Sequence, residues 1–394
     1  MLESFYQTHD YLVQHLENSA DRELMNVINW NDRLIAIKGG RGVGKTDFLL
    51  AYAKQQTEAH PELMRTILYV NFNNFYFADH SLYEFASEFV RQGGRTLLLD
   101  QMFKYANWSK ELRDCFFHFT NLQIIFSASP VMRLTENNSD IGHIVRVYNL
   151  RGYSFREYLN LKTGSNFPVF TMQDILLRHE NITDKILAKV NPLDYFDAYL
   201  RQGYYPALID TGFYNEIMVR MMNMMIEVDV LIIKQFDVAS LGKIRKLLYK
   251  MMMEIPCGLN VTQLAEDIDI SRATLLNYIK SLEDARLINL LYKDGKEFPM
   301  KPAKIYMQNP NLCFALPSRI IDAQSLAETF FYSSVYVKHK VNATDNAAFV
   351  VDGQTRFDVC AEMPRKCGFR YAAIGNMQKG SGKLIPLWLF GFLY

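Results

Sequence analysis

Short apolar runs alternate with segments of helical periodicity through the first 150 residues of the chain. Runs rich in leucine, isoleucine and valine between polar turns predict buried β-strands. Segments whose apolar residues recur three or four positions apart predict helices that cover a sheet. The alternation predicts an α/β fold, a parallel sheet flanked by helices. The five expected strands are Leu34–Ile37, Thr66–Asn71, Arg95–Asp100, Gln123–Ser129 and Ile144–Leu150.

Beyond residue 150 the pattern divides into three further segments. Residues 151–237 have helical spacing throughout and predict a helical lid. Residues 238–299 predict three helices and a strand, the order of a winged helix: Gly242–Met253, Gln263–Ile268, Arg272–Glu283 and Arg286–Tyr292. Residues 300–394 predict a small α/β domain, with a helix at 325–334 before strands at Val335–Val341, Ala348–Val351 and Phe357–Ala361. The expected domains are therefore 1–150, 151–237, 238–299 and 300–394.

Composition excludes several functional classes. Of the 394 residues, 49% are apolar and 22% are charged, which is typical of globular domains with large cores. The formal net charge of +1 gives no overall field that would draw the chain to nucleic acid or to a membrane surface. The five cysteines form no C-x-x-C pair, so neither a disulfide framework nor a zinc site is expected. No apolar stretch approaches 18 residues and no signal peptide is visible, so we expect a cytoplasmic location.

A glycine-rich loop follows the first predicted strand and opens a helix. The sequence G-x-x-x-x-G-K-T is the phosphate-binding loop, in the strand–loop–helix context that it requires. Glycines let successive backbone N–H groups curl around a polyphosphate, at the positive end of the following helix. Lys45 is expected to reach the β- and γ-phosphates of ATP, and the Thr46 hydroxyl to ligate Mg²⁺. The expected nucleotide-binding residues are Gly39, Gly40, Arg41, Gly42, Val43, Gly44, Lys45, Thr46 and Asp47.

The third predicted strand ends in Asp100, the second part of a P-loop ATP site. The strand delivers this carboxylate to the edge of the sheet beside the phosphates, where it would hold Mg²⁺. Hydrolysing enzymes commonly have glutamate next, but here the residue is Gln101, whose amide orients water and cannot take its proton. The fourth strand ends in small hydroxyl residues, and either Ser127 or Ser129 could hydrogen-bond the attacking water. We predict catalytic roles for Lys45, Asp100, Gln101 and Ser127.

Motifs spread over most of the chain resemble those of one family, a bacterial and archaeal group of AAA-type, STAND-like ATPases. The resemblance implies an ATPase core, a helical lid, a winged helix and a C-terminal restriction-endonuclease-like domain. It rests on Asp100-Gln101, Trp108, Ile124–Ser129, Asp140–Leu150, Ser154–Leu159, Glu328–Phe331 and the apolar tail Ile385–Tyr394, which is similar to a closing strand. In such relatives a Gly-x-Pro or Gly-x-x-Pro turn packs its proline on the adenine, and Pro206 is the matching residue here.

Three departures from the family pattern predict a slow enzyme. Gln101 replaces the usual glutamate, and His143-Ile144 stand where arginines often follow the sensor strand. Arg133 or Arg146 could substitute for an arginine finger, which contributes several powers of ten to the rate. Without the base and the finger, ATP binding would persist while hydrolysis became slow. The sequence therefore predicts an ATP-binding ATPase that acts as a nucleotide-dependent switch.

The predicted winged helix raises an alternative, a nucleotide-gated DNA-binding or regulatory protein. In DNA readers the third helix of such a module enters the major groove. Residues 238–299 hold nine basic and eight acidic residues, so their net charge is only +1. So small a net charge gives little attraction for the phosphate backbone of DNA, and packing inside the protein is the favoured role of this module.

The C-terminal segment lacks the residues that a restriction-type nuclease requires. Such a site needs an acidic residue on one strand and Glu-x-Lys on the next to hold Mg²⁺ and activate water. This chain has Ala348-Phe349 and then Phe357–Glu362, and the remaining Glu328 and Asp358 would make a poor metal site. We expect a degenerate nuclease-like domain without catalysis, which offers a binding surface for a protein partner.

Overall fold

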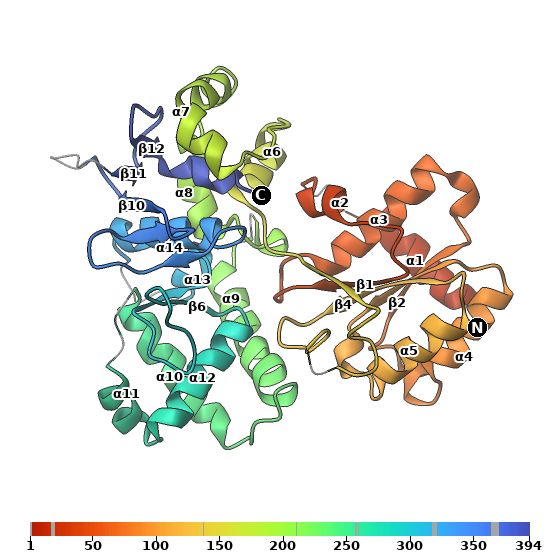
Figure 1. Ribbon diagram of the computed structural model, residues 1–394. Helices are drawn as coiled ribbons and strands as arrows, with labels where there is room; N and C mark the ends of the chain where they lie inside the picture. The colour runs from red at the N-terminus through yellow and green to blue at the C-terminus, as the bar shows by residue number, and fades with distance from the viewer. Residues whose placement is uncertain are drawn as a thin grey trace. The chain divides into compact units, whose positions relative to one another are not determined.

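The computed structural model describes residues 2–16, 20–136, 138–209, 211–256, 258, 260–316, 321–363 and 370–394. The chain forms two compact units, Met1–Arg151 and Gly152–Tyr394. Each unit has its own sheet and core, and each is described by itself (Figure 1).

The first unit is built on the five-stranded parallel sheet that the sequence predicts. Its spatial order is β2-β3-β4-β1-β5, so the strand before the glycine loop lies inside the sheet between β4 and β5. Strand β3 lies beside β4, and Asn71 pairs with Asp100 at the ends of β2 and β3. The predicted α/β fold is therefore confirmed. The strands are β1 Leu34–Lys38, β2 Ile67–Asn71, β3 Thr96–Asp100, β4 Gln123–Ala128 and β5 Arg146–Asn149.

Helices cover both faces of this sheet because the crossover between two parallel strands must pass over a face. Strands β1, β3 and β4 are buried along nearly their whole length. A capping box of Ser81 and Glu84 fixes the start of α4 and satisfies two backbone N–H groups. The helices are α1 Leu2–Gln14, α2 Glu23–Val27, α3 Lys45–Ala59, α4 Leu82–Arg91 and α5 Trp108–His118.

A histidine of helix α1 completes the hydrogen bonding of the edge strand β2. The backbone N–H of Tyr69 donates to Nδ1 of His9 at 3.1 Å, and His9 is only 3% exposed. The imidazole must be neutral at Nδ1 to accept this bond. Burial lowers the pKa of His9, opposed by the nearby Asp10. The N-terminal helix thus stabilises the strand that borders β3.

The second unit begins with the helices predicted for residues 151–237. Capping boxes at Ser154–Glu157 and Thr171–Asp174 start α6 and α7. Helix α9 continues into a π-helix, Met225–Ile232, and its methionines Met218, Met222 and Met225 are buried, so they fill the core. The helices are α6 Phe155–Thr163, α7 Met172–Leu187, α8 Leu193–Gln202 and α9 Tyr214–Met224.

Three helices and an antiparallel hairpin follow. Ser271 caps the third helix by accepting from the N–H of Thr274, as its sequence position predicts. The hairpin pairs Ile288 with Met307, so its second strand lies beyond residue 299, where we expected a domain boundary. The elements of this segment are α10 Ser240–Glu254, α11 Val261–Ile268, α12 Arg272–Asp284, β6 Ile288–Leu291 and β7 Lys304–Met307.

A second five-stranded sheet, in the order β12-β11-β10-β9-β8, packs on α14. Phe331 of α14 stacks near Phe349 of β9 and Phe357 of β10, which forms the core of this layer. The remaining elements are α13 Pro310–Cys313, α14 Ala323–Val335, β8 Val341–Asn342, β9 Phe349–Val351, β10 Thr355–Cys360, β11 Tyr371–Ile374 and β12 Leu384–Pro386.

Two strand predictions in this region are wrong. The sequence predicts a strand at Val335–Val341, but the strand found there is only Val341–Asn342. Val335 is instead the last residue of α14, where it is buried. The apolar tail is a strand only at Leu384–Pro386, and Leu387–Phe392 form a 3₁₀-helix. All six of these residues are buried and apolar or glycine. The tail therefore lacks the alternation of polar and apolar residues that would distinguish a strand from a helix in the sequence.

We predict that stability of the first unit falls as the pH drops from about 7.5 to 5.5. The pKa of His9 is lower in the folded state, so its contribution is present above the unfolded pKa and lost on acidification. Loss of the bond to Tyr69 should cost about 1 kcal/mol, or roughly 2–4 °C in Tm. His9→Asn keeps an acceptor that does not titrate, and thermal melts against pH should show a shallower slope. Equal slopes for both proteins would contradict this role.

Candidate functional site

The glycine loop connects β1 to α3 at the carboxyl end of the sheet. Gly42 and Gly44 have φ of 77° and 85°, left-handed values that favour glycine, and Gly44 directly precedes the helix. A Cβ on Gly39 would lie 2.5 Å from the carbonyl oxygen of Leu150, so only glycine fits between the loop and the end of β5. The N–H of Gly39 donates to the Ala128 carbonyl at 3.1 Å. The loop is thus shaped by its glycines and tied to both neighbouring strands.

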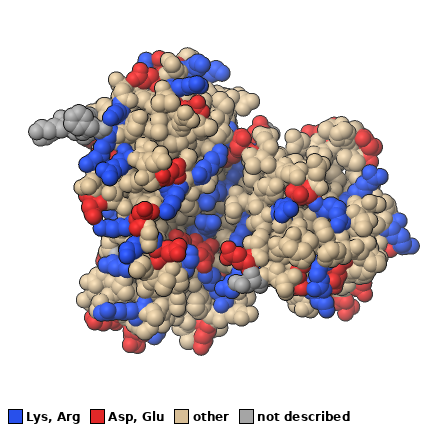
Figure 2. Space-filling view, viewed as in Figure 1, with Lys and Arg blue, Asp and Glu red and all other residues tan. Residues whose placement is uncertain are grey.

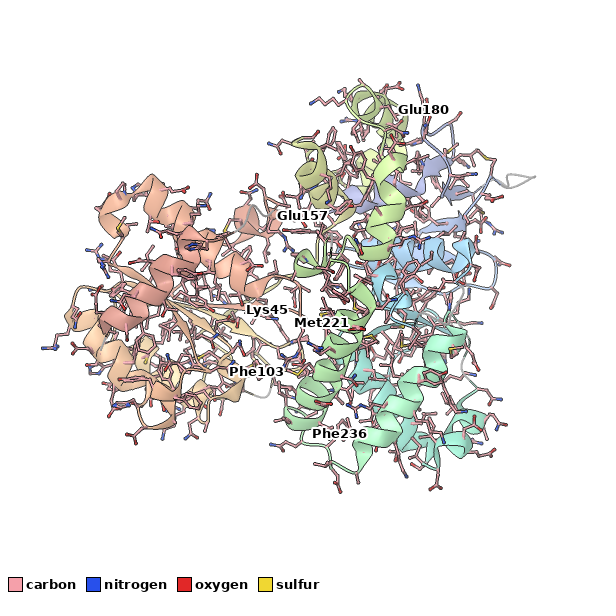
Figure 3. The ribbon with its side chains drawn as sticks, turned by 180° about the vertical axis from the view of Figure 1, so that it is seen from behind. Lys45, Phe103, Glu157, Glu180, Met221 and Phe236 are labelled. Atoms are coloured by element: carbon pink, nitrogen blue, oxygen red, sulfur yellow. The ribbon has the colours of Figure 1, made fainter. Side chains whose placement is uncertain are left out.

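Lys45 points its ammonium group back over this loop. Its Nζ lies 2.8 Å from the carbonyl oxygen of Gly39 and 2.7 Å from that of Gly40. Arg41 lies over the ring of Phe103 at 5.4 Å, and Figure 3 shows Lys45 and Phe103 at the same end of the sheet. Arg41, Gly42, Gly44, Lys45, Thr46 and Asp47 are partly exposed, whereas Val43 is buried. A cation therefore stands inside a loop that is open to an anion.

Four donors converge on the buried carboxylate of Asp100, which is 2% exposed. Oδ2 accepts from the Thr46 hydroxyl at 2.7 Å and from the Tyr69 hydroxyl at 2.9 Å. Oδ1 accepts from the Gln101 N–H at 2.9 Å and from the Ser127 hydroxyl. Both oxygens of this buried carboxylate are thus satisfied by hydrogen bonds. The structure thus brings together Thr46, Asp100, Gln101 and Ser127, four residues that the sequence assigned to the site.

These residues fit a magnesium ion better than a transition metal. Thr46 and Asp100 supply hard oxygen atoms at 2.7 Å from one another, next to the phosphate loop. Mg²⁺ takes few protein ligands and completes its shell with water and phosphate oxygens. Within the described residues no group of three His, Cys, Asp or Glu side chains could hold a metal alone. The donor set is therefore that of an ion bound together with a polyphosphate.

Gln101 has a defined orientation at the end of β3. Its φ of 60° is left-handed, and its Oε1 accepts a hydrogen bond from the amide of Asn73. Its N–H also donates to the Ser127 hydroxyl at 3.0 Å. Ser129 instead accepts from the Val131 N–H in the turn after β4, outside these contacts. An oriented amide stands where a general base would be needed, so no side chain at this position can accept a proton.

Tyr69 is the residue of this cluster that sequence reasoning missed. Its ring is 3% exposed, and burial together with the charge of Asp100 raises its pKa, so the hydroxyl remains a donor. A tyrosine in an apolar strand gives no local sign of this role. Its position beside Asp100 follows only from the order of the strands. Asn71 of β2 pairs with Asp100 of β3, and Tyr69 lies two residues before Asn71, on the same face of β2.

Other predicted site residues lie elsewhere. Pro206 begins a short 3₁₀-helix, Pro206–Leu208, in the second unit, so its contact with adenine stays a prediction. Arg133 and Arg146 are both exposed on the first unit, and Arg146 has Asp32 at 4.0 Å. Either guanidinium is accessible from solvent, and neither joins the Asp100 cluster.

Several bases of the α10–α12 module are paired with acids of the same module. Lys250 pairs with Asp267, whose carbonyl also accepts from Lys246 at 2.6 Å. Lys280 pairs with Glu283 at 2.7 Å and with Asp284 at 3.2 Å. On the face shown in Figure 2, basic and acidic groups are interspersed. The module therefore offers little free positive charge to a phosphate backbone.

The nuclease residues are separated by the C-terminal sheet. Phe357 and Val359 are buried, and Phe357 packs against Phe331 of α14, so the alternate residue Asp358 leaves the opposite face. Glu328 projects from α14 itself and accepts from the Tyr306 hydroxyl at 2.8 Å. Because the two carboxylates lie on opposite sides of the sheet, they form no shared metal site.

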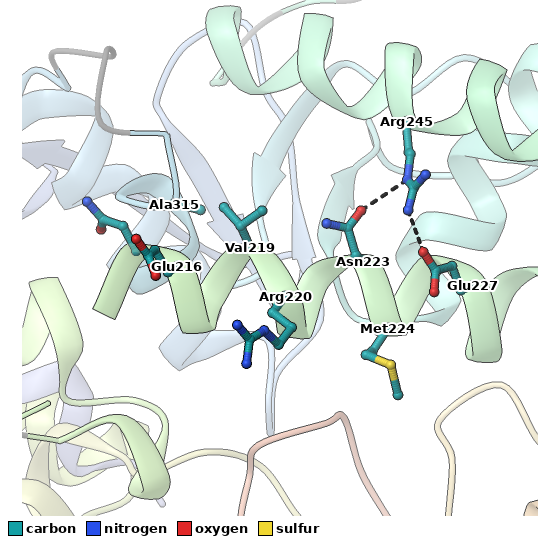
Figure 4. A pocket seen from close by; sticks show the side chains of 9 residues that line it. Glu216, Val219, Arg220, Asn223, Met224, Glu227, Arg245 and Ala315 are labelled. Carbon is teal, nitrogen blue, oxygen red and sulfur yellow. Dashed lines mark hydrogen bonds and ion pairs between the residues drawn. The ribbon is translucent and has the colours of Figure 1, made fainter. Parts of the chain in front are cut away.

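A cavity of about 600 Å³ lies along helix α9 (Figure 4). Arg245 donates to the Asn223 Oδ1 at 3.0 Å and pairs with Glu227. Arg220 and Met224 point away from this pair in Figure 4. The donors of Arg245 are thus engaged by the protein itself. Among the described residues, no helix has the length and apolar character needed to cross a membrane.

We predict that Tyr69→Phe lowers the free energy of unfolding by about 1.5–3 kcal/mol, because it removes a donor from a buried charge. Tyr52→Phe is the matched control, since its hydroxyl reaches the neutral Gln123 amide at 3.4 Å and should contribute less. Urea unfolding of the three proteins measures the difference. Equal losses in both variants would show that Tyr69 does not stabilise the carboxylate.

Comparisons with known proteins agree with this geometry. Residues 31–159 match a family described as an AAA domain, and residues 193–320 match a domain of unknown function, DUF8612. An uncharacterized protein from Methanocaldococcus jannaschii is 28% identical over 280 residues, 67% of this chain. This chain spans 58% of the length of that relative.

Two solved structures are distantly similar. AMPPCP-bound DnaA from Aquifex aeolicus shares 13% identity over 71% of this chain and 86% of its own, with a TM-score of 0.28. ORC2 from Aeropyrum pernix, in ADPNP-ADP complexes, shares 14% identity over 73% and 86%, with a TM-score of 0.33. The loop geometry and the strand order agree with the match of residues 31–159 to an AAA domain.

Proposed function

We propose that the protein binds ATP with Mg²⁺ and hydrolyses it slowly, as a nucleotide-dependent switch. The observation that supports this most strongly is the hydrogen bond of 2.7 Å between Thr46 and Asp100, beside the glycine loop that holds Lys45. Thr46 and Asp100, which we assign to the two halves of a P-loop ATP site, are far apart in sequence and meet at this hydrogen bond. A structural role alone would not require a lysine, a hydroxyl and a carboxylate at this place.

The residues of the first unit have distinct tasks in this proposal. The backbone N–H groups of residues 39–46 and the Lys45 ammonium bind the phosphates. Thr46 and Asp100 would hold Mg²⁺, which neutralises charge on the phosphates when it is bound. Gln101 and Ser127 orient the attacking water by hydrogen bonds. Because an amide cannot take the proton from that water, the chemical step is slow.

The switch role is supported by contacts within each unit beside the chain link between residues 151 and 152. Arg22 donates from Nη1 to the Val43 carbonyl of the loop at 3.1 Å, and from Nη2 to the carbonyl of Arg151, the last residue of the first unit. On the other side of the junction, the Tyr153 N–H donates to the Tyr204 carbonyl at 2.8 Å. A movement of the loop on binding phosphate would therefore be transmitted through Arg22 to the backbone of residue 151.

Several finer assignments belong to the same proposal. Pro206 would pack on the adenine, since it follows Tyr204 in the turn that holds Tyr153. We further propose that the protein acts in the cytoplasm and that its C-terminal domain binds a protein partner. DNA reading by α12 is not favoured, because several bases of its module are paired with acids and residues 238–299 carry a net charge of only +1.

We predict that ATP with Mg²⁺ raises the Tm of the wild type by several degrees at 100 times Kd, which corresponds to about 2.7 kcal/mol. Lys45→Ala should lose most of this shift and release no phosphate above background. Lys110→Ala removes an exposed lysine from the same unit and should behave as the wild type. No shift with ATP or GTP in the wild type would reject nucleotide binding.

Restoring an acid should increase the rate. We predict that Gln101→Glu releases phosphate at least about 10-fold faster than the wild type, because a general base contributes 10²–10⁴-fold in many enzymes. Its ATP affinity should stay within about threefold, since Gln101 contacts the carboxylate through its backbone N–H. Phosphate-release assays under saturating ATP measure the rate. An unchanged rate would mean that another step, and not the missing base, limits hydrolysis.

A further inference from the structure

The C-terminal sheet has one face covered by a helix and one face that bears a cavity. Phe349 and Phe357 are fully buried and pack against Phe331 of α14. Their neighbours in the strands point to the other face. Strand pairing joins Asn342 to Val350 and Val350 to Arg356, so these three side chains lie in one row across β8, β9 and β10.

The same row continues onto the next strand. Tyr371 pairs with Phe357, and Arg370 precedes Tyr371 by one residue just as Arg356 precedes Phe357. A cavity of about 570 Å³ lies over this row and is lined by Asn342, Val350, Arg356 and Arg370, among other residues. Because β10 and β11 are neighbours, Arg356 in β10 and Arg370 directly before β11 belong to one wall of the cavity.

The two arginines are rich in unused donors. Each guanidinium carries five N–H groups, arranged to match a carboxylate or a phosphate. Arg370 forms an ion pair with Asp358 at 3.7 Å, a distance at which its N–H groups make no hydrogen bond to that carboxylate. Across the described parts of the chain, neither guanidinium donates a hydrogen bond to a protein acceptor. Arg245 in the α9 cavity differs, since it has Asn223 and Glu227 as partners.

Asn342 is a second and independent sign of a ligand. It is 6% exposed, and its Nδ2 donates to the Tyr292 carbonyl at 3.3 Å. Its Oδ1 is buried and has no hydrogen-bond partner among the residues that the structure describes. A buried acceptor without a donor costs free energy that a ligand with a hydroxyl or an amine would recover.

Basic residues beside the cavity are paired with acids, which favours a small ligand over a polyanion such as nucleic acid. Asp294 lies in the lining and pairs with Lys340 at 3.1 Å, and Lys293 pairs with Asp345 at 2.7 Å. Such pairing leaves no extended basic stripe of the kind that a nucleic-acid backbone needs. Two arginines and one amide acceptor within one cavity instead match a compact molecule.

We propose that this cavity binds a small organic anion that also carries a hydroxyl or amine donor. Its carboxylate or phosphate group lies between Arg356 and Arg370, and its donor reaches the Oδ1 of Asn342. All of these residues belong to the second unit, so the site does not depend on ATP binding at Lys45. It would give the degenerate nuclease-like domain a role in ligand recognition.

Thermal shift of the full chain tests the site with two probes, ribose 5-phosphate for the phosphate arm and gluconate for the carboxylate arm. We expect a saturable rise in Tm with at least one probe below about 10 mM, and none with uncharged ribose. The Lys45→Ala protein should keep this shift, which separates the site from the glycine loop. If neither probe shifts the Tm, the proposal is wrong.

Substitutions then locate the binding. Arg356→Met with Arg370→Met keeps the aliphatic stems and should require at least 10-fold more probe for the half-maximal shift. Arg178→Met with Arg220→Met removes the same charge from exposed helix positions outside the lining and should leave the response unchanged. Hydrogen exchange of the wild type with the effective probe should slow at residues 340–358. Unchanged exchange there, or an equal response of both double variants, would overturn the assignment.

Discussion

The carboxylate of Asp100 organises the first unit, because donors from three other parts of the chain meet on its two oxygens. Thr46 lies in the first turn of α3, Tyr69 in the middle of β2 and Ser127 one residue before the end of β4. A buried carboxylate is costly unless its oxygens accept hydrogen bonds. Strands β2, β3 and β4 and the start of the loop helix are therefore held in one arrangement by this carboxylate, and that arrangement is the proposed site for Mg²⁺.

A buried polar network has a comparable role in the second unit. Asn311 accepts from the Tyr204 N–H at 2.8 Å and donates to the carbonyls of Tyr199 and Leu200 at 2.8 and 2.9 Å. Asn309 donates to the Tyr205 hydroxyl at 3.0 Å. These amides, which precede and begin α13, fix the turn that holds Pro206. Because the Tyr204 carbonyl of this turn accepts from the Tyr153 N–H, the first residues of the second unit are joined to its core.

The two units differ in what their sites retain. In the first, the phosphate loop and its carboxylate are in place while the usual base is an amide, a combination that favours binding over turnover. In the second, the sheet separates Asp358 from Glu328, so metal-dependent cleavage has no geometric basis. The row of Asn342, Arg356 and Arg370 keeps polar groups on the uncovered face. Ligand recognition is therefore the task that we propose for both units.

The sequence alone determined the strands of the first sheet and the residues of the glycine loop, because strand burial and loop curvature depend on residues that are close in the chain. It also marked the positions of Asp100 and Gln101, since each strand end is a local signal. Tertiary structure decided that Tyr69 and Ser127 share Asp100, that His9 completes β2, and that Arg356 and Arg370 stand in one wall. It also decided that residues 387–392 form a 3₁₀-helix. These outcomes depend on which strands are neighbours and on burial from every side, and neither is encoded in the spacing of residues along one segment.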